Sequence, residues 1–185
     1  MNPKTKSRLV VILTVLFIVI IGFMTIVAMR PSDFRVTRSM AMLAPPEAVF
    51  AQVNDFHKWE AWSPWAKIDP AMKQTYEGAP EGVGAIYNWE GNMEVGSGRI
   101  TMIESRPNDF IQLRLEFFKP MKGVNTAEFT FKPEGEQTVV TWTMFGKNNF
   151  ICKAFQLFMS MDKMIGDQFE KGLSDMKAIV ERQAP

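Results

Sequence analysis

The stretch Ile111-Gln-Leu-Arg-Leu-Glu-Phe117 alternates strictly between apolar and polar residues. Successive side chains of a β-strand point to opposite faces of a sheet. The odd positions of this stretch are therefore predicted to face a core and the even positions to face solvent. The pattern is typical of a half-buried strand rather than of a helix.

The same alternation recurs along much of the chain. Ala127, Phe129 and Phe131 alternate with polar residues, as do Val140, Trp142 and Met144. Clusters of Gly, Pro, Asn and Asp separate these runs and predict turns. The pairs Gly82-x-Gly84 and Gly96-x-Gly98 precede expected strands, so we interpret them as hairpin and bulge glycines rather than phosphate-binding loops. Strands are expected at 34–43, 73–77, 84–90, 98–104, 110–118, 126–132 and 138–145.

Helix-periodic segments flank the strands. A short helix is predicted after Pro45-Pro46, since proline is tolerated in a first turn. A long one is predicted over residues 150–182, because apolar residues recur there at spacings of three and four. The order of elements predicts an α+β fold in which a curved sheet wraps the final helix. The predicted inward stripe of that helix is Phe158, Met161, Ile165, Phe169, Gly172, Met176 and Ile179.

The segment Leu9 to Met29 contains no charged residue and is almost entirely apolar. Twenty-one residues at about 1.5 Å per residue give roughly 31 Å, which matches a hydrocarbon core of about 30 Å. The alternative is a cleaved signal peptide, whose apolar region is shorter, roughly 7 to 15 residues. We therefore predict an uncleaved transmembrane helix over residues 9–29.

Basic residues at the N-terminus indicate an orientation for this helix. Lys4, Lys6 and Arg8 occur without any acidic residue, which favours a cytoplasmic N-terminus. Arg30, Arg35 and Arg38 follow the helix and weaken this bias. We expect residues 1–30 to form the cytoplasmic N-terminus and anchor, and residues 31–185 to form a domain outside the cytoplasm.

Composition excludes several classes of protein. The chain of 185 residues has 21 basic and 20 acidic side chains, and four of the basic ones lie in residues 1–30, which leaves 17 basic and 20 acidic residues in the rest. A nucleic-acid partner is therefore not expected. One cysteine, Cys152, and one histidine, His57, exclude an intrachain disulfide and a zinc site built from Cys and His.

Three motifs together identify a family resemblance. They are the Trp-rich string WEAWSPWAKIDP at 59–70, the string GVGAIYNWEG at 82–91 followed by Gly96-Ser-Gly98, and MDKMIGDQFEKGL at 161–173. These resemble membrane-anchored bacterial proteins of the START-like helix-grip superfamily, also called SRPBCC or polyketide cyclase/dehydrase-like proteins. The resemblance covers residues 33–182. It implies a seven-stranded antiparallel sheet gripping the C-terminal helix and a deep apolar cavity between them. Combined with the charge bias around residues 9–29, a resemblance to bacterial proteins leads us to expect a periplasmic domain at the bacterial inner membrane.

The aromatic residues on the inward faces are the candidates for a ligand cavity, since such pockets are mostly apolar. A filled core is the alternative interpretation of the same residues. Metal and cofactor sites are not expected. On the C-terminal helix, Asp162, Asp167 and Glu170 are expected to be solvated charges that pair with neighbouring lysines. The candidate cavity residues are Trp62, Trp65, Tyr87, Trp89, Leu115, Phe117, Phe129, Trp142, Met144, Met161, Ile165 and Phe169.

Three functions are compatible with these features. The first is non-catalytic binding of a lipid-like or other hydrophobic small molecule close to the membrane. The second is a cyclase or dehydratase, which would need proton carriers such as Tyr87, His57 or Asp162 converging in one cavity. The third is a protein-interaction module with a closed core and an exposed apolar patch. The family resemblance does not choose between them, because one fold hosts many functions.

The anchor interpretation predicts that the full chain fractionates with membranes and retains residue 1, whereas residues 31–185 alone form a soluble folded domain. Every strand predicted above lies beyond Met29, which is the reason for this expectation. N-terminal sequencing and membrane fractionation test it. Mature protein beginning near residue 30 would contradict the anchor.

The orientation is a separate prediction. A reporter fused after Pro185 should be active outside the cytoplasm, because Lys4, Lys6 and Arg8 favour a cytoplasmic N-terminus. Activity in the cytoplasm would reverse the orientation.

Overall fold

The computed structural model describes residues 3–183. The chain divides into two compact units. One, the helical unit, consists of residues 3–33 and 148–160, and the other, the sheet unit, consists of residues 34–147 and 161–183. Each is described by itself below.

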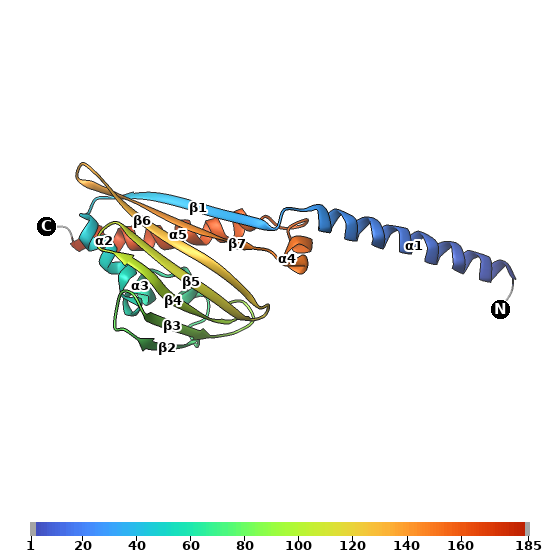
Figure 1. Ribbon diagram of the computed structural model, residues 1–185, viewed down its shortest axis with the longest axis horizontal. Helices are drawn as coiled ribbons and strands as arrows, with labels where there is room; N and C mark the ends of the chain where they lie inside the picture. Colours follow the sequence, from blue (N-terminus) through green and yellow to red (C-terminus); the bar gives the residue numbers. More distant parts are fainter. Residues whose placement is uncertain (1–2, 184–185) are drawn as a thin grey trace. The chain divides into compact units, whose positions relative to one another are not determined.

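The sheet unit contains a seven-stranded antiparallel sheet that curves around the helix α5 (Met161–Gln183) (Figure 1). The strand order is β1-β7-β6-β5-β4-β3-β2, so every connection from β2 onward joins neighbouring strands. This confirms the helix-grip architecture predicted from the sequence. The strands are β1 (Asp33–Met42), β2 (Lys73–Gly78), β3 (Ala85–Glu90), β4 (Ser97–Arg106), β5 (Phe110–Lys119), β6 (Gly123–Glu134) and β7 (Gln137–Lys147).

Short helices fill the connection between β1 and β2. The first begins at Pro46, where proline occupies an early helical position, as expected. The second of these α-helices and the 3₁₀ turn that follows it contact α5. The helices are α2 (Pro46–Asn54), η1 (Phe56–Lys58), α3 (Trp59–Trp62) and η2 (Pro64–Lys67).

Alternation along the strands produces one buried sheet face. Ile111 and Leu113 of β5 are almost completely buried, and Phe129 of β6 lies directly opposite Trp142 of β7. Hydroxyl pairs link two strands, with Thr37 of β1 3.0 Å from Thr143 of β7 between their side-chain oxygens. The inward faces predicted for β5, β6 and β7 are therefore confirmed by burial.

Glycines shape the hairpin between β3 and β4. Gly96 has φ +64°, a left-handed conformation that glycine adopts without strain. The register of β4 against β5 shifts between Ser97 and Gly98, which marks a bulge. A side chain at Gly98 would collide with the Trp89 ring, so this glycine makes room for the indole. The interpretation of these glycines as hairpin and bulge residues holds.

The predicted long C-terminal helix over 150–182 is instead two helices, α4 (Phe150–Phe155) and α5. After α4 the backbone forms hydrogen bonds between residues three apart, as in a 3₁₀ turn. Leu157 N–H donates to Ala154 O, and Phe158 N–H donates to Phe155 O. Phe158, which was predicted to belong to the inward stripe, is 79% exposed. The buried positions of α5 are Gly166, Phe169, Gly172, Leu173, Met176 and Val180.

An arginine on β1 holds the N-terminal half of α5. The Arg38 guanidinium donates to the Glu170 carboxylate at 2.7 Å and to the Asp162 carboxylate at 3.1 Å. A side chain at Gly166 would collide with this guanidinium, so the glycine gives it space. Hydrogen bonds from Arg38 lower the pKa of Asp162. The contribution of this pair to stability is thus present at neutral pH and is lost as the pH falls through the lowered pKa.

The helical unit contains α1 (Pro3–Met29) and α4. The two helices contact each other, and Lys153 Nζ donates to Ala28 O at 3.2 Å at the C-terminal end of α1. α1 begins six residues before the predicted span of 9–29. It is long and apolar enough to cross a membrane.

We predict that Gly172→Ala destabilises the sheet unit by about 1 to 3 kcal/mol. The added Cβ would lie 3.0 Å from Pro64 Cδ and 3.1 Å from the Trp142 ring, and both neighbours are rigid. This overpacking should exceed the helix-propensity gain of about 1 kcal/mol.

Ser174→Ala, at an exposed position of the same helix, is the matched control and should leave stability unchanged or slightly higher. Denaturant-induced unfolding measures both variants. Equal free energies of unfolding for Gly172→Ala and the parent would contradict the close contact.

Candidate apolar cavity

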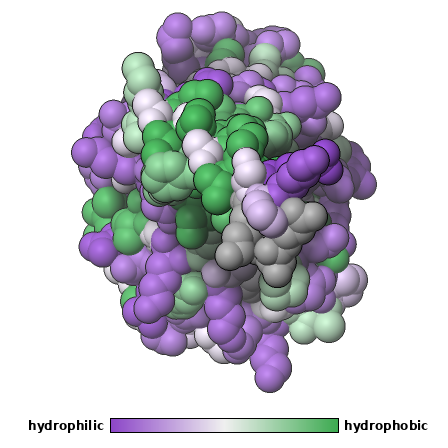
Figure 2. Space-filling view, turned by 90° about the vertical axis from the view of Figure 1, so that its right-hand side faces the viewer, coloured by the Kyte–Doolittle hydropathy of each residue, from purple (hydrophilic) through white to green (hydrophobic). Residues whose placement is uncertain are grey.

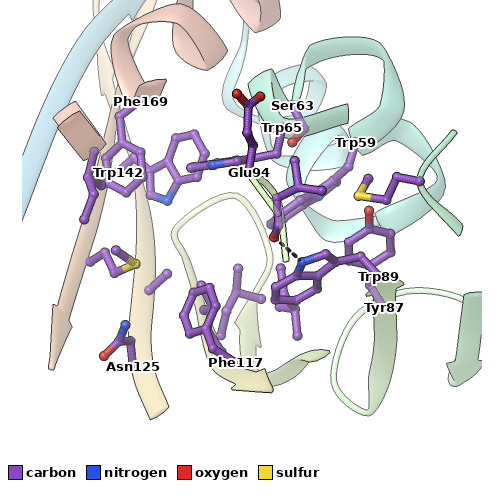
Figure 3. Close-up of a pocket in the computed structure, with 18 of the residues that line it drawn as sticks. Trp59, Ser63, Trp65, Tyr87, Trp89, Glu94, Phe117, Asn125, Trp142 and Phe169 are labelled. Carbon is purple, nitrogen blue, oxygen red and sulfur yellow. Dashed lines mark hydrogen bonds between the residues drawn. The ribbon is translucent and has the colours of Figure 1, made fainter. Parts of the chain in front are cut away.

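The sheet unit encloses a cavity of about 330 Å³ between the inner face of the sheet, the α3–η2 segment and α5 (Figure 3). Most of its lining side chains are aromatic or aliphatic. The lining residues are Trp59, Ser63, Trp65, Met72, Tyr87, Trp89, Glu94, Val95, Ile100, Leu113, Leu115, Phe117, Lys119, Pro120, Asn125, Ala127, Trp142, Met144, Met161, Ile165 and Phe169.

One wall of the cavity joins β7, η2 and α5. The rings of Trp142 and Phe169 stack with centroids 4.0 Å apart and planes at 7°. Trp65 meets both rings edge-on, with centroids 5.7 Å from Trp142 and 6.2 Å from Phe169. Stacked and edge-on arrangements are favourable geometries for aromatic pairs. Ring contacts therefore join β7, η2 and α5 along this wall.

The facing wall comes from β3 and β5. Tyr87 and Trp89 stack with centroids 6.2 Å apart, and Phe117 meets the Trp89 ring edge-on. Trp89 Nε1 donates to Val95 O at 3.0 Å, the bond drawn as a dashed line in Figure 3. This bond fixes the indole, because a buried Trp N–H needs an acceptor. Figure 3 shows Tyr87 and Trp89 on the opposite side of the cavity from Trp142 and Phe169.

Ten of the twelve residues predicted from the sequence line this cavity. The other two, Trp62 and Phe129, lie in the packed core beside it. Trp62 is fully buried and its Nε1 donates to Gln52 O at 3.0 Å. Its ring packs edge-on against Phe129 and Trp142. Both residues support the aromatic wall from behind. The ten are Trp65, Tyr87, Trp89, Leu115, Phe117, Trp142, Met144, Met161, Ile165 and Phe169.

Several lining residues did not appear among the sequence candidates. Leu113 and Ala127 were predicted to face inward, and the alternation that placed them there could also have placed them at the cavity. Glu94, Val95 and Pro120 lie in turns, where no periodic pattern predicts which way a side chain points. Only the pairing of the strands brings these turns together.

The few polar lining groups have distinct positions. Ser63 is buried and Asn125 is half-buried, whereas Glu94 and Lys119 are exposed. Burial raises the pKa of the Tyr87 phenol well above its usual value, so this hydroxyl stays neutral at physiological pH. It can therefore donate or accept a hydrogen bond inside an otherwise apolar space.

Two of the three candidate proton carriers lie outside the cavity lining. His57 Nδ1 lies 2.9 Å from the Asp55 carboxylate, and its ring stacks on Tyr76. Asp162 pairs with Arg38. Tyr87 remains in the cavity, without His57 or Asp162 to share a proton transfer. Within the described residues, no group of three or more His, Cys, Asp or Glu side chains could hold a metal ion.

A curved antiparallel sheet gripping a long helix around an apolar cavity defines the helix-grip class of proteins. The chain belongs to the family described as polyketide cyclase / dehydrase and lipid transport, whose model matches residues 33–181. No curated protein matches the chain significantly.

Solved structures share this fold at low sequence identity. Protein CV1439 from Chromobacterium violaceum is 16% identical, with a TM-score of 0.58 over 82% of this chain and 99% of that chain. The Aha1 dimer from Colwellia psychrerythraea is 15% identical, with a TM-score of 0.54 over 80% and 96%. The di-domain ARO/CYC StfQ from the steffimycin biosynthetic pathway is 12% identical, with a TM-score of 0.60 over 82% of this chain and 52% of StfQ. At these identities the similarity shows the fold alone.

We predict that Ile165→Trp leaves the stability of the sheet unit unchanged or raises it. Ile165 lines the cavity, so a larger side chain would extend into open space. Met176→Trp is the matched control on the same helix. Met176 is fully buried and does not line the cavity, so overpacking should cost about 1 to 3 kcal/mol.

Thermal or denaturant unfolding of both variants measures the difference. A loss of stability for Ile165→Trp as large as that for Met176→Trp would show that the space beside Ile165 is filled.

Proposed function

We propose that this protein binds a lipid-like or other hydrophobic small molecule in the cavity, without catalysis, while α1 holds it at a membrane. The observation that carries the proposal is the cavity itself, about 330 Å³ and lined mainly by apolar side chains. Ligand pockets are commonly concavities of roughly 300 to 1,000 Å³ with a few placed polar groups.

The distribution of polarity supports an amphipathic ligand. Aromatic rings form two facing walls, which suit a flat ring system or an acyl chain. Asn125, Glu94 and Lys119 offer hydrogen bonds and charge to polar groups of the molecule. The neutral hydroxyl of the buried Tyr87 adds one more hydrogen-bonding group. A mainly apolar molecule with a few polar groups fits this lining.

The proposed anchor α1 tethers the binding domain at a membrane. α1 is long and apolar enough to span a bilayer, and hydrophobic molecules are concentrated in bilayers. A tethered domain meets such molecules at a high effective concentration. We place the sheet unit on the periplasmic side of a bacterial inner membrane, on the basis of Lys4 and Arg8 before the span.

A cyclase or dehydratase is the second candidate. Two ARO/CYC di-domain proteins, StfQ and BexL, share the fold. Tyr87 would be the proton carrier inside the cavity. Such an enzyme needs a second group within hydrogen-bond reach of the same reacting atom. The placement of His57 and Asp162 outside the cavity lining favours binding over catalysis.

Binding is tested with a fluorescent fatty-acid analogue and the full chain in lipid nanodiscs. We expect saturable energy transfer from protein tryptophans to the probe, because Trp89 and Trp142 form opposite walls of the cavity. Ile165→Trp should abolish saturable binding by filling the space. Saturation that is unchanged in Ile165→Trp, or absent in the parent, would contradict the proposal.

Catalysis is tested by incubating the protein with the fatty-acid probe and, separately, with an aromatic polyketide-like substrate, and by determining the mass of each compound afterwards. A binding protein returns the probe unchanged, and Tyr87→Phe should retain binding within a few-fold. If the parent chemically alters an aromatic polyketide-like substrate and Tyr87→Phe does not, the enzymatic candidate replaces the proposed function.

A further inference from the structure

The segment after β7 exposes an unusual number of large apolar side chains. We define the interfacial segment as residues 150–159, which comprise α4 and the turn that follows it. We propose that this segment lies in the interfacial layer of the bilayer beside the end of α1. The inference rests on the proposed membrane anchor and adds a second membrane contact to it.

The exposed apolar residues lie on one face of the segment. Ile151 and Phe155 are four residues apart in α4, which places them side by side on the helix surface, and Phe158 is exposed in the turn that follows. Clustered exposed apolar side chains mark protein or membrane contact sites. The exposed members are Phe150, Ile151, Phe155, Phe158 and Met159.

The helical unit places this face at a defined depth. The uncharged part of α1, residues 9–29, is roughly 31 Å long and matches a hydrocarbon core of about 30 Å. The last turn of α1 consequently lies at the boundary between the hydrocarbon core and the headgroup region. Val27, in that turn, is fully buried although the rest of α1 is largely exposed, and α4 is the helix that contacts α1. The interfacial segment thus lies at the level of the headgroups.

The charges of the segment also suit this layer. Lys153 donates to the Ala28 carbonyl at the end of α1, where a cation is favoured by unpaired carbonyls and by the helix dipole. Residues 148–160 contain no acidic side chain, so nothing in them repels lipid phosphates. An amphipathic segment in this position buries its apolar face about 5 to 10 Å into the interface.

A bilayer is favoured over a protein partner because the exposed face continues an apolar surface. Apart from the buried Val27, the side chains of α1 from Leu9 to Met29 are exposed and almost all apolar, and the interfacial segment contacts the C-terminal end of this helix. Figure 2 shows clustered apolar side chains, in green, on the face that it views. A lipid environment that covers α1 would cover this face as well.

The test uses the full chain in vesicles of phosphatidylcholine and phosphatidylglycerol. Cys152→Ser removes the single native cysteine, and new cysteines at Phe158, Leu16 or Val83 carry an environment-sensitive fluorophore one at a time. Phe158 reports on the interfacial segment and Leu16 on the middle of α1. Val83 is the matched control, because it is an exposed apolar residue of the sheet unit.

Lipids brominated at shallow or deep acyl positions then quench each label according to its depth. We expect Phe158→Cys to be quenched several-fold more than Val83→Cys, and more by shallow than by deep bromines. Leu16→Cys should be quenched most by deep bromines.

The outcomes separate this inference from the anchor. Quenching of Leu16→Cys without quenching of Phe158→Cys would overturn the interfacial segment and leave the anchor in place. Absence of quenching at both positions would overturn both. A blue-shifted but unquenched label at Phe158→Cys would show that protein covers the face, which also overturns the inference. Probe binding in the cavity is measured independently of all three results.

Discussion

The stack of Trp142 on Phe169 is the contact on which the sheet unit depends. It joins β7 to α5 with ring centroids 4.0 Å apart. On its C-terminal side α5 lies close to its neighbours, where Gly172 permits contact with Pro64 and Trp142, and Leu173 and Met176 are fully buried. On its N-terminal side Ile165 and Met161 line the cavity instead. One helix is thus tightly packed along one half and borders open space along the other.

The N-terminal half of α5 needs a support that does not fill the cavity, and Arg38 provides it. Its guanidinium lies against Gly166 and joins two carboxylates one on either side of that glycine, Asp162 and Glu170. Ion pairs at an exposed position contribute little to stability individually. Here they position the helix over β1, while the interior beside Ile165 remains open. The ion pairs of Arg38 therefore position the N-terminal half of α5 without filling the cavity beside it.

Period-two and period-three-to-four patterns predicted the strands, the final helix and their inward faces, whereas the space between sheet and helix was implied by the family resemblance. Trp62 and Phe129 could not be separated from the true lining residues, because an inward-facing ring at the wall and one behind it have the same sequence pattern. The break at 156–160 was missed because Phe158 continues the apolar spacing of α5 while belonging to a different unit. Arg38 was missed because its partners lie more than 120 residues away.

In the proposed function, apolar molecules occupy the space between the two aromatic walls. Methyl NMR of the protein during titration with a saturated fatty acid tests it directly, since each methyl group reports on its own surroundings. We expect saturable shifts for the methyl groups of Met144, Met161 and Ile165, with those of Leu173 and Met176 nearly unchanged. No saturable shift at the first three, or equal shifts throughout the core, would contradict it.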